Sequence, residues 1–155
     1  MMDEQKQSVM TNETSASAGM QEARMYLRQV RDAYRRTQAL CAQAEKYREL
    51  AMRATGRTDA LRVSGTPQRS KVETYVLELM DTHEALQREI HRLLNISREA
   101  EKLISRLEDS RLRCVLQMRY LCGLDWEEVA QRLNYTLRWV HKLHREAIEQ
   151  LAQKM

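Results

Sequence analysis

Four basic side chains recur at helical spacing near the end of the sequence. Because positions three and four apart share one face of a helix, a helix here would carry them on a single surface stripe. The residues from 129 to 145 include no Asp or Glu, although the whole chain has 22 acidic residues. Arginine can donate two hydrogen bonds to a guanine edge, and lysine or histidine can reach bases or phosphates. The stripe therefore predicts binding to double-stranded DNA, and its members are Arg138, His141, Lys142 and Arg145.

The stripe follows a short turn between two helical patterns, 125–133 and 137–153. Asn134 stands where the first pattern must end, and asparagine is the best non-glycine residue for the left-handed backbone that such an end requires. Thr136 can cap the second helix by accepting a backbone N–H. A turn this short makes the two helices cross steeply and offers the second one outward, which is typical of a helix-turn-helix. We therefore expect 137–153 to be a recognition helix.

The first of these helices has its own start signal. Asp125 can cap it, and Glu128 three residues later gives the capping-box spacing, with Asp in place of Ser or Thr. Apolar residues at helical intervals predict two inner faces, one of Val129, Ala130 and Leu133 and one of Val140, Leu143, Ala147 and Leu151. The free N–H groups after the threonine cap suit a phosphate. The predicted DNA-binding residues are Tyr135, Thr136, Leu137, Arg138, His141, Lys142 and Arg145.

A long heptad repeat precedes this module. Steps of four and three from Val72 give an apolar seam interrupted only by His83 and Ser97, which is typical of a coiled-coil helix. Its predicted partner is the stretch 20–55, folded back antiparallel across a loop at about 56–70. The apolar residues of that first helix are smaller than those of the seam that starts at Val72. Part of this seam can therefore also contact a second copy of the chain, and we expect a homodimer through this hairpin. The predicted seam is Val72, Val76, Leu79, His83, Leu86, Ile90, Leu93, Ser97, Ala100, Ile104 and Leu107.

The composition predicts an all-α fold with three parts. One Pro, four Gly and no Phe among 155 residues leave too few turn-forming and β-forming residues for a sheet protein. The polar, aperiodic stretch 1–19 is expected to be a disordered tail, followed by the helical hairpin 20–108 and the helix-turn-helix module 109–155. No stretch is long and apolar enough to span a membrane and no signal-peptide core is present, so we expect a cytoplasmic protein.

Other chemistry is not favoured by the sequence. The net charge of +4 leans only mildly toward an anionic partner. Three widely spaced cysteines fit reduced thiols better than a disulfide framework. The histidine pairs 141/144 and 83/91 lack a supporting ligand, so no metal is expected, and no motif predicts a cofactor or catalysis. Trp126 is expected to pack, whereas the indole N–H of Trp139 could meet a phosphate.

The stretch MRYLCGLDWEEVAQRLNYTLRWVHKLHREAIEQL, residues 118–151, resembles the helix-turn-helix of region four in bacterial primary sigma factors. The resemblance implies that Thr136 stands at the serine cap of that family and Asn134 at its glycine. The positions where region four touches the major groove of the promoter's −35 element correspond to Leu137, Arg138, His141 and Lys142. Leu137 and Arg138 differ from the arginine and glutamate that are frequent there, so the resemblance does not imply a −35 element as the target.

From about residue 20 onward, the chain also resembles a family of phage and prophage proteins of Gram-positive bacteria, grouped with the ArpU-type late-transcription regulators. These proteins pair a stretch like YLRQVRDAYRRTQAL with a sigma-like module. The resemblance implies a sequence-specific DNA-binding regulator of transcription that is nucleoid-associated in the cytoplasm of a bacterial host cell, with RNA polymerase as a further candidate partner. Two alternatives remain open. One is a DNA-packaging recognition subunit like a small terminase, and the other is a protein that binds RNA polymerase or a sigma factor without touching DNA.

Overall fold

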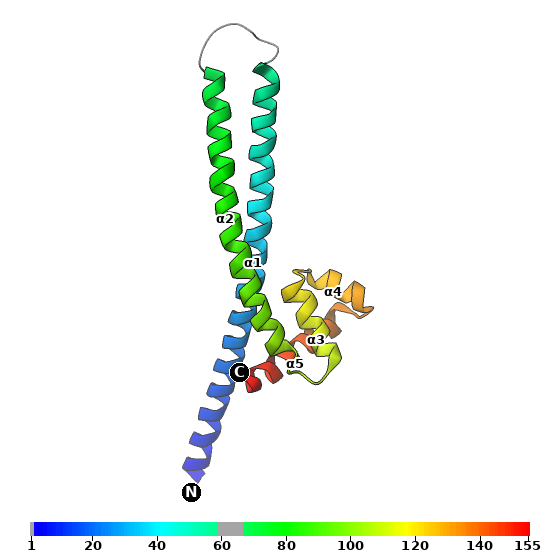
Figure 1. The fold of residues 1–155 in the computed structure, drawn as a ribbon. Helices are drawn as coiled ribbons and strands as arrows, with labels where there is room; N and C mark the ends of the chain where they lie inside the picture. The colour runs from blue at the N-terminus through cyan, green and yellow to red at the C-terminus, as the bar shows by residue number, and fades with distance from the viewer. Residues whose placement is uncertain (1, 59–66) are drawn as a thin grey trace. The chain divides into compact units, whose positions relative to one another are not determined.

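The computed structural model describes residues 2–58 and 67–155, and these residues form helices with no strand (Figure 1). The predicted all-α fold is confirmed. None of the described helices combines the length and the apolar character that crossing a membrane requires. The elements are α1 (Met2–Thr58), α2 (Pro67–Ile104), α3 (Ser110–Leu116), the π-helical turn η1 (Gln117–Leu121), α4 (Trp126–Leu133) and α5 (Leu137–Lys154).

The first helix is longer than the sequence pattern predicts. The structure differs from the predicted tail 1–19, because the backbone is helical from Met2 onward. That stretch contains no proline, and its Met, Gln, Glu and Ala residues have favourable helix propensities, so a lack of apolar periodicity does not prevent a helix. The predicted loop 56–70 is also narrower, since α1 continues to Thr58 and α2 begins at Pro67; residues 59–66 lie outside the described part of the chain.

The helices form two compact units that do not follow the predicted division between residues 108 and 109. Unit 1 combines the chain up to Asp32 with Asn95–Met155, and unit 2 is Ala33–Leu94. Both long helices contribute residues to each unit. The helix-turn-helix is therefore not a domain of its own, because its core is completed by residues that the sequence analysis assigned to the hairpin.

Unit 2 is an antiparallel pair of helices formed by α1 and α2, as the heptad pattern predicts (Figure 1). The buried side chains on α1 are small, such as Ala33 and Ala44, and small contact residues reduce the distance between helix axes. On α2 the buried Thr82 satisfies its hydroxyl group by donating a hydrogen bond to the carbonyl oxygen of Glu78 at 2.7 Å. Hydrophobic contact and close backbone approach together hold the pair.

The register of the α2 seam is only partly as predicted. Every seventh residue is half-buried, namely Val72, Leu79, Leu86 and Leu93. The residues predicted between them are exposed, however, with Val76 and Ile90 at 41% and 38%. The less exposed residues lie one position earlier in the sequence, at Tyr75, Thr82 and Glu89. Glu89 is tolerated there because its carboxylate accepts a hydrogen bond from Arg36 Nε on α1 at 3.2 Å.

Unit 1 has an apolar core that draws on both ends of the chain. Leu27 of α1, Ile104 of α2 and Leu151 of α5 are each completely buried. Burying a side chain of this size stabilises a fold by about 1.5–3 kcal/mol, so contributions from α1 are substantial for this unit. The predicted inner faces of the helix-turn-helix are confirmed for Val129, Ala130, Val140, Leu143, Ala147 and Leu151, to which the structure adds Ile148.

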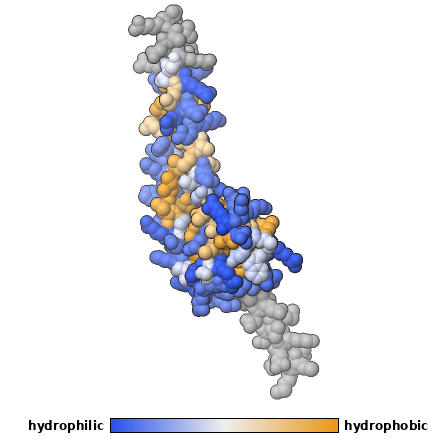
Figure 2. All heavy atoms as spheres, turned by 90° about the vertical axis from the view of Figure 1, so that its right-hand side faces the viewer, coloured by the Kyte–Doolittle hydropathy of each residue, from blue (hydrophilic) through white to orange (hydrophobic). Residues whose placement is uncertain are grey.

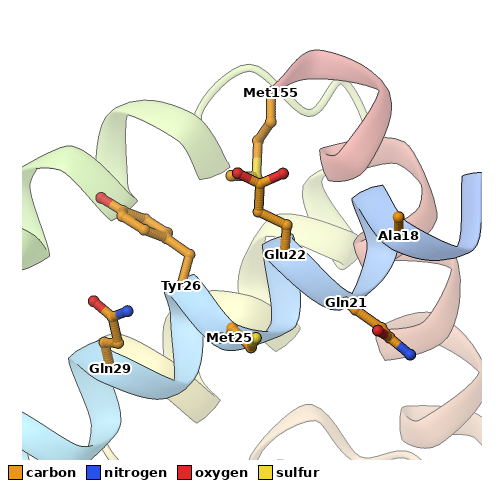
Figure 3. Close-up of a pocket in the computed structure, with 7 residues that line it drawn as sticks. All are labelled: Ala18, Gln21, Glu22, Met25, Tyr26, Gln29 and Met155. Carbon is orange, nitrogen blue, oxygen red and sulfur yellow. The ribbon is translucent and has the colours of Figure 1, made fainter. Parts of the chain in front are cut away.

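The surface of the chain is mostly polar. Figure 2 shows one face of the molecule, on which orange apolar residues lie in patches among blue polar ones. In unit 1, one flank of α1 borders a shallow groove of about 360 Å³, and Glu22 is the one charged side chain among its lining residues (Figure 3). Tyr26 in this groove donates a hydrogen bond to Glu99 Oε2 at 3.4 Å, and burial together with that carboxylate raises the pKa of Tyr26. This flank of α1 therefore carries no basic side chain.

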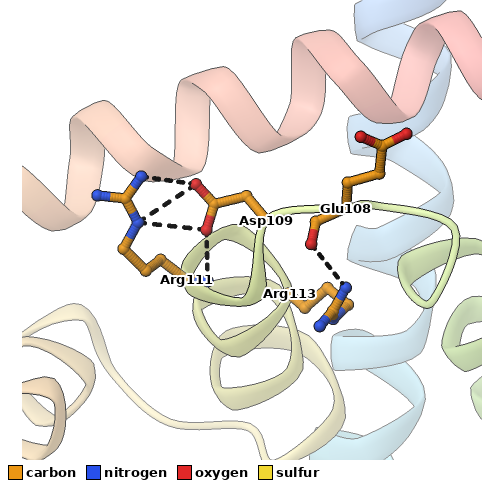
Figure 4. A network of polar contacts seen from close by, with 4 residues as sticks. All are labelled: Glu108, Asp109, Arg111 and Arg113. Atoms are coloured by element: carbon orange, nitrogen blue, oxygen red, sulfur yellow. Dashed lines mark hydrogen bonds and ion pairs between the residues drawn. The ribbon is translucent and has the colours of Figure 1, made fainter.

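The bend between α2 and α3 is held by two arginines (Figure 4). Asp109 caps α3 by accepting the backbone N–H of Arg111 at 2.8 Å, and the guanidinium of the same arginine donates to its carboxylate at 2.7 Å. These bonds hold the pKa of Asp109 below its usual value. Arg113 donates to the carbonyl oxygen of Glu108 at 3.0 Å, which satisfies a carbonyl in the segment between α2 and α3. Asp109 stands directly before Ser110, the first residue of α3.

Candidate nucleic-acid interface

The turn between α4 and α5 is built by the residues at its two ends. Asn134 has φ 55° and ψ 43°, the left-handed conformation that the sequence predicts. Its N–H donates to the Gln131 carbonyl at 3.2 Å, and the next N–H, of Tyr135, donates to the Ala130 carbonyl at 2.9 Å. This pair of bonds is a Schellman motif, which satisfies the last carbonyls of α4. The helix therefore ends at a fixed residue.

α5 starts again directly after this motif. Thr136 adopts an extended backbone, and its hydroxyl oxygen accepts the N–H of Trp139 at 3.3 Å, so the predicted N-cap is confirmed. At the start of α4, the N–H of Asp125 donates to Glu128 Oε2 at 2.8 Å, which is the predicted capping-box bond. Both helices consequently have defined first residues, and the first turn of α5 faces away from the core.

The outer face of α5 brings most of the predicted DNA-binding residues together on one exposed surface. Arg138, His141 and Lys142 are exposed, and Leu137 beside them is 40% exposed. The buried face of the same helix lies on the other side, at Val140 and residues spaced from it by three and four. The basic side chains are therefore free to reach a partner without disturbing the core.

Two of the predicted residues differ from the others. Arg145 is exposed, but its Nε donates to Glu149 Oε1 at 3.1 Å on the same helix, which partly neutralises its charge. Tyr135 is half-buried, and its backbone N–H is used by the Schellman motif.

Lys142 lies with its Nζ 4.9 Å from the centre of the Trp139 ring, a cation–π contact on the surface. The sharpest candidates for DNA contact are therefore Arg138, His141 and Lys142.

Behind this stripe lies an aromatic cluster that the sequence only partly predicts. The Trp126 ring is half-buried and lies 4.8 Å from the ring of His141 and 4.7 Å from that of His144, centroid to centroid. The predicted packing role of Trp126 is confirmed. By holding the ring of His141, Trp126 also positions a predicted DNA-binding side chain. Trp139 is 38% exposed, as expected for a residue outside the core.

Arg119 organises this cluster, and it is a residue that the sequence reading missed. Its side chain is 9% exposed, and its guanidinium carbon lies 4.4 Å from the centre of the Trp126 ring. One guanidinium nitrogen donates to the Leu124 carbonyl at 2.7 Å and lies 3.6 Å from Asp125 Oδ1. Arg119 thus ties η1 to the segment that leads into α4. In the sequence it is a single arginine between Met118 and Tyr120, with no pattern that could have identified it.

His144 is half-buried beside Tyr120, with its Nε2 at 2.9 Å from the tyrosine hydroxyl oxygen. Burial lowers the pKa of His144 from 6.5 to about 4, and the nearby positive charges of Arg24, His141 and Arg119 act in the same direction. The histidine is therefore neutral at pH 7 and belongs to the support of the α5 face. Its ring does not carry charge toward a partner.

The histidines and cysteines do not assemble into a metal site. Within residues 17–56 and 71–155, no group of three or more His, Cys, Asp or Glu side chains is placed to hold an ion. The rings of His141 and His144 pack on Trp126, and His83 and His91 are exposed on α2. Cys41, Cys114 and Cys122 are free thiols.

Comparison with known proteins gives one family. Residues 53–152, which include α2, α3, η1, α4 and most of α5, match DUF1492, described as a protein of unknown function. No curated protein and no solved structure matches the chain. Because the match covers more than half of the chain, the chain belongs to the DUF1492 family.

Proposed function

We propose that this protein is a sequence-specific DNA-binding regulator of transcription of the phage type, which acts without catalysing a reaction. α5 is its recognition helix, and Arg138 and His141 in the first turns of that helix contact base edges. Lys142 and Arg145, further along, bind phosphates. DNA lies in the cytoplasm of a bacterial host, so the protein would act there, with RNA polymerase as a second candidate partner.

The observation that carries the proposal is the exposed, basic outer face of α5 directly after a capped, left-handed turn. Each feature by itself also occurs in helical bundles that bind nothing. Here the turn sets where α5 begins, and the buried residues Val140 and Leu143 hold its inner face against the core. On its outer face, Arg138 and Lys142 form no ion pair within the described part of the chain. A helix presented in this way fits the major groove, whose width admits one α-helix.

The proposal predicts a large and selective loss of binding when the stripe is changed. A preferred duplex is first selected from a random pool with the wild-type protein. Arg138→Ala should then weaken binding to that duplex by about 1–3 kcal/mol and relax the sequence preference, because a contact to a base edge is lost. Lys142→Ala should weaken all duplexes about equally and lower the salt slope by about one unit. Fluorescence anisotropy at several salt concentrations measures both effects.

Arg88→Ala is the matched control, since Arg88 is an exposed arginine in unit 2 that pairs with Glu84. It removes the same charge from a different surface and should leave binding unchanged. If the selection yields no preferred duplex, or if Arg138→Ala and Lys142→Ala together leave affinity unchanged in a folded protein, the DNA-binding proposal fails. Binding of the wild-type protein to RNA polymerase alone would then favour the interaction protein, and a ring of many copies would favour the packaging subunit.

A second copy of the chain is the proposed partner of unit 2. The exposed residues of α2 include a stripe at steps of four and three, reading Val76, Met80, His83, Gln87, Ile90 and Leu94. Along this stripe two apolar residues are followed by two polar ones and then by two apolar ones, so the pattern is symmetric about residue 85. A twofold axis there would place Val76 against Leu94, Met80 against Ile90 and His83 against Gln87 of the second copy. Such a self-complementary stripe is what a symmetric dimer requires.

Charge on this stripe should therefore separate the copies. The double variant Met80→Lys/Ile90→Lys should sediment as a monomer with unchanged helicity, whereas the wild-type protein should sediment as a dimer, because four lysines would meet across the axis. Met25→Lys, an equally exposed methionine in unit 1, is the control and should remain dimeric. A wild-type protein that stays monomeric at every concentration tested would contradict the dimer.

A further inference from the structure

The α1 segment in unit 1 carries a second row of basic side chains. Arg24, Arg28 and Arg31 are separated by four and three residues and so lie along one side of the helix. The adjacent side, at Leu27 and Val30, is buried in the core of unit 1. The arginine row therefore runs along the edge where α1 meets the rest of the unit. It lies outside the residues that match the DUF1492 family, 53–152.

These arginines have no acidic partner. Arg24 and Arg28 are exposed, Arg31 is half-buried, and within the described part of the chain no ion pair engages any of the three. The Nε–H of Arg31 is buried and donates to no acceptor within the described part of the chain, although buried donors are normally satisfied. Further along α1 the arrangement is different, because Arg36, Arg48 and Arg53 each pair with a glutamate.

The row lies on the same side of unit 1 as the cluster behind the α5 stripe. The positive charges of all three arginines act on Tyr120, and that of Arg24 also acts on His144. His144 is in ring contact with Trp126, whose other neighbour is His141 of the stripe. Arg24 and His141 therefore both lie near the cluster of Tyr120, Trp126 and His144 within unit 1. The other flank of α1, at the groove of Figure 3, carries Glu22 and no basic residue, so the basic residues of α1 between residues 17 and 32 lie on one flank.

We propose that Arg24, Arg28 and Arg31 form a second DNA-contacting surface, which binds the phosphate backbone beside the site that α5 reads. This inference rests on the proposed DNA-binding function. An arginine guanidinium is always charged and presents a planar fork of donors that matches phosphate oxygens. Unpaired arginines at a spacing of one helical turn suit successive phosphates of one strand. The surface adds affinity without reading sequence, because phosphates are the same at every base pair.

The test compares two double variants of α1 that remove the same charge. Arg24→Ala/Arg28→Ala should lower the salt slope of binding to a duplex of arbitrary sequence by about two units, because each lost phosphate contact removes about 0.9. The sequence preference of the protein should stay the same. Arg48→Ala/Arg53→Ala is the control, since both of these arginines are exposed and paired with glutamates in unit 2. This control should retain the wild-type slope.

Duplex length sharpens the comparison. If the α1 row binds phosphates that flank the α5 site, Arg24→Ala/Arg28→Ala should lose affinity on a duplex of about two helical turns and should match the wild type on one of about one turn. A wild-type slope in Arg24→Ala/Arg28→Ala would overturn the inference, and so would an equal loss in the control. In either case a normal response of Arg138→Ala would leave the proposed function standing. If the wild-type protein binds no duplex at all, the proposed function fails first.

Discussion

Leu27→Ala is expected to destabilise unit 1 by about 2–5 kcal/mol, the usual cost of removing a fully buried leucine side chain. Leu27 lies on α1 and is 0% exposed, and the core that it enters contains residues of α3, α4 and α5. Both tryptophans of the chain, Trp126 and Trp139, are in unit 1. Their fluorescence during denaturation with urea therefore reports on this unit, and the midpoint should move to lower urea concentration.

Met25→Ala provides the control for this substitution, because Met25 lies on the same helix two residues away and is 62% exposed. Its transition should stay close to that of the wild type. If the tryptophan transition were the same in Leu27→Ala as in the wild-type protein, α1 would not be part of the unit that contains the helix-turn-helix. The division predicted from the sequence, with a separate module from residue 109, would then be correct.

The free energy of unfolding of unit 1 is expected to decrease as the pH falls from 6.5 toward 4. Because the pKa of His144 is about 4 in the folded protein and 6.5 when unfolded, the unfolded state binds more protons between these values. Stability from the neutral imidazole is fully present above pH 6.5 and is lost as the pH falls toward 4. The shift corresponds to about 3 kcal/mol, since one unit is worth about 1.4 kcal/mol. Urea denaturation followed by tryptophan fluorescence at a series of pH values measures this loss.

His144→Gln should flatten the pH dependence over this range, because glutamine can keep a hydrogen bond with Tyr120 and has no proton to gain. His83→Gln is the matched control, since His83 is an exposed histidine of α2 in unit 2, and it should leave the slope unchanged. The charged neighbours of His144 are Arg24, His141 and Arg119, and all of them oppose its protonation. An equal pH slope in wild type and His144→Gln would show that another group is responsible.

The turn between α4 and α5 could be predicted from the sequence because every interaction in it is local. The Schellman motif at Asn134, the Thr136 cap and the bond from Asp125 to Glu128 each join residues at most five positions apart. Such bonds depend on the identities of a few neighbouring residues. For the same reason, the exposed face of α5 followed from the spacing of its apolar and basic residues.

The features that could not be predicted depend on contacts between distant residues. The half-buried residues Val72, Leu79, Leu86 and Leu93 belong both to the predicted seam of α2 and to the observed one. The residues between them are set by packing against α1, where Arg36 pairs with Glu89. The boundary of unit 1 depends on packing between two segments that are far apart in the sequence, the chain up to Asp32 and Asn95–Met155, and Leu27 is buried in that unit. Arg119 was missed because a single arginine gives no periodic signal, and its role appears only when η1 places it over Trp126.

The discontinuity of unit 1 also has a consequence for the order of events during synthesis. α1 residues such as Val30 leave the ribosome long before Leu151, which belongs to the same core, has been added. At about 5–20 residues per second, this delay is on the order of ten seconds. Unit 2 needs nothing beyond Leu94 and can form first. The unit that carries the candidate DNA interface is therefore the last to close, and until then the apolar face at Leu27 has no core to enter and is open to aggregation or to a chaperone.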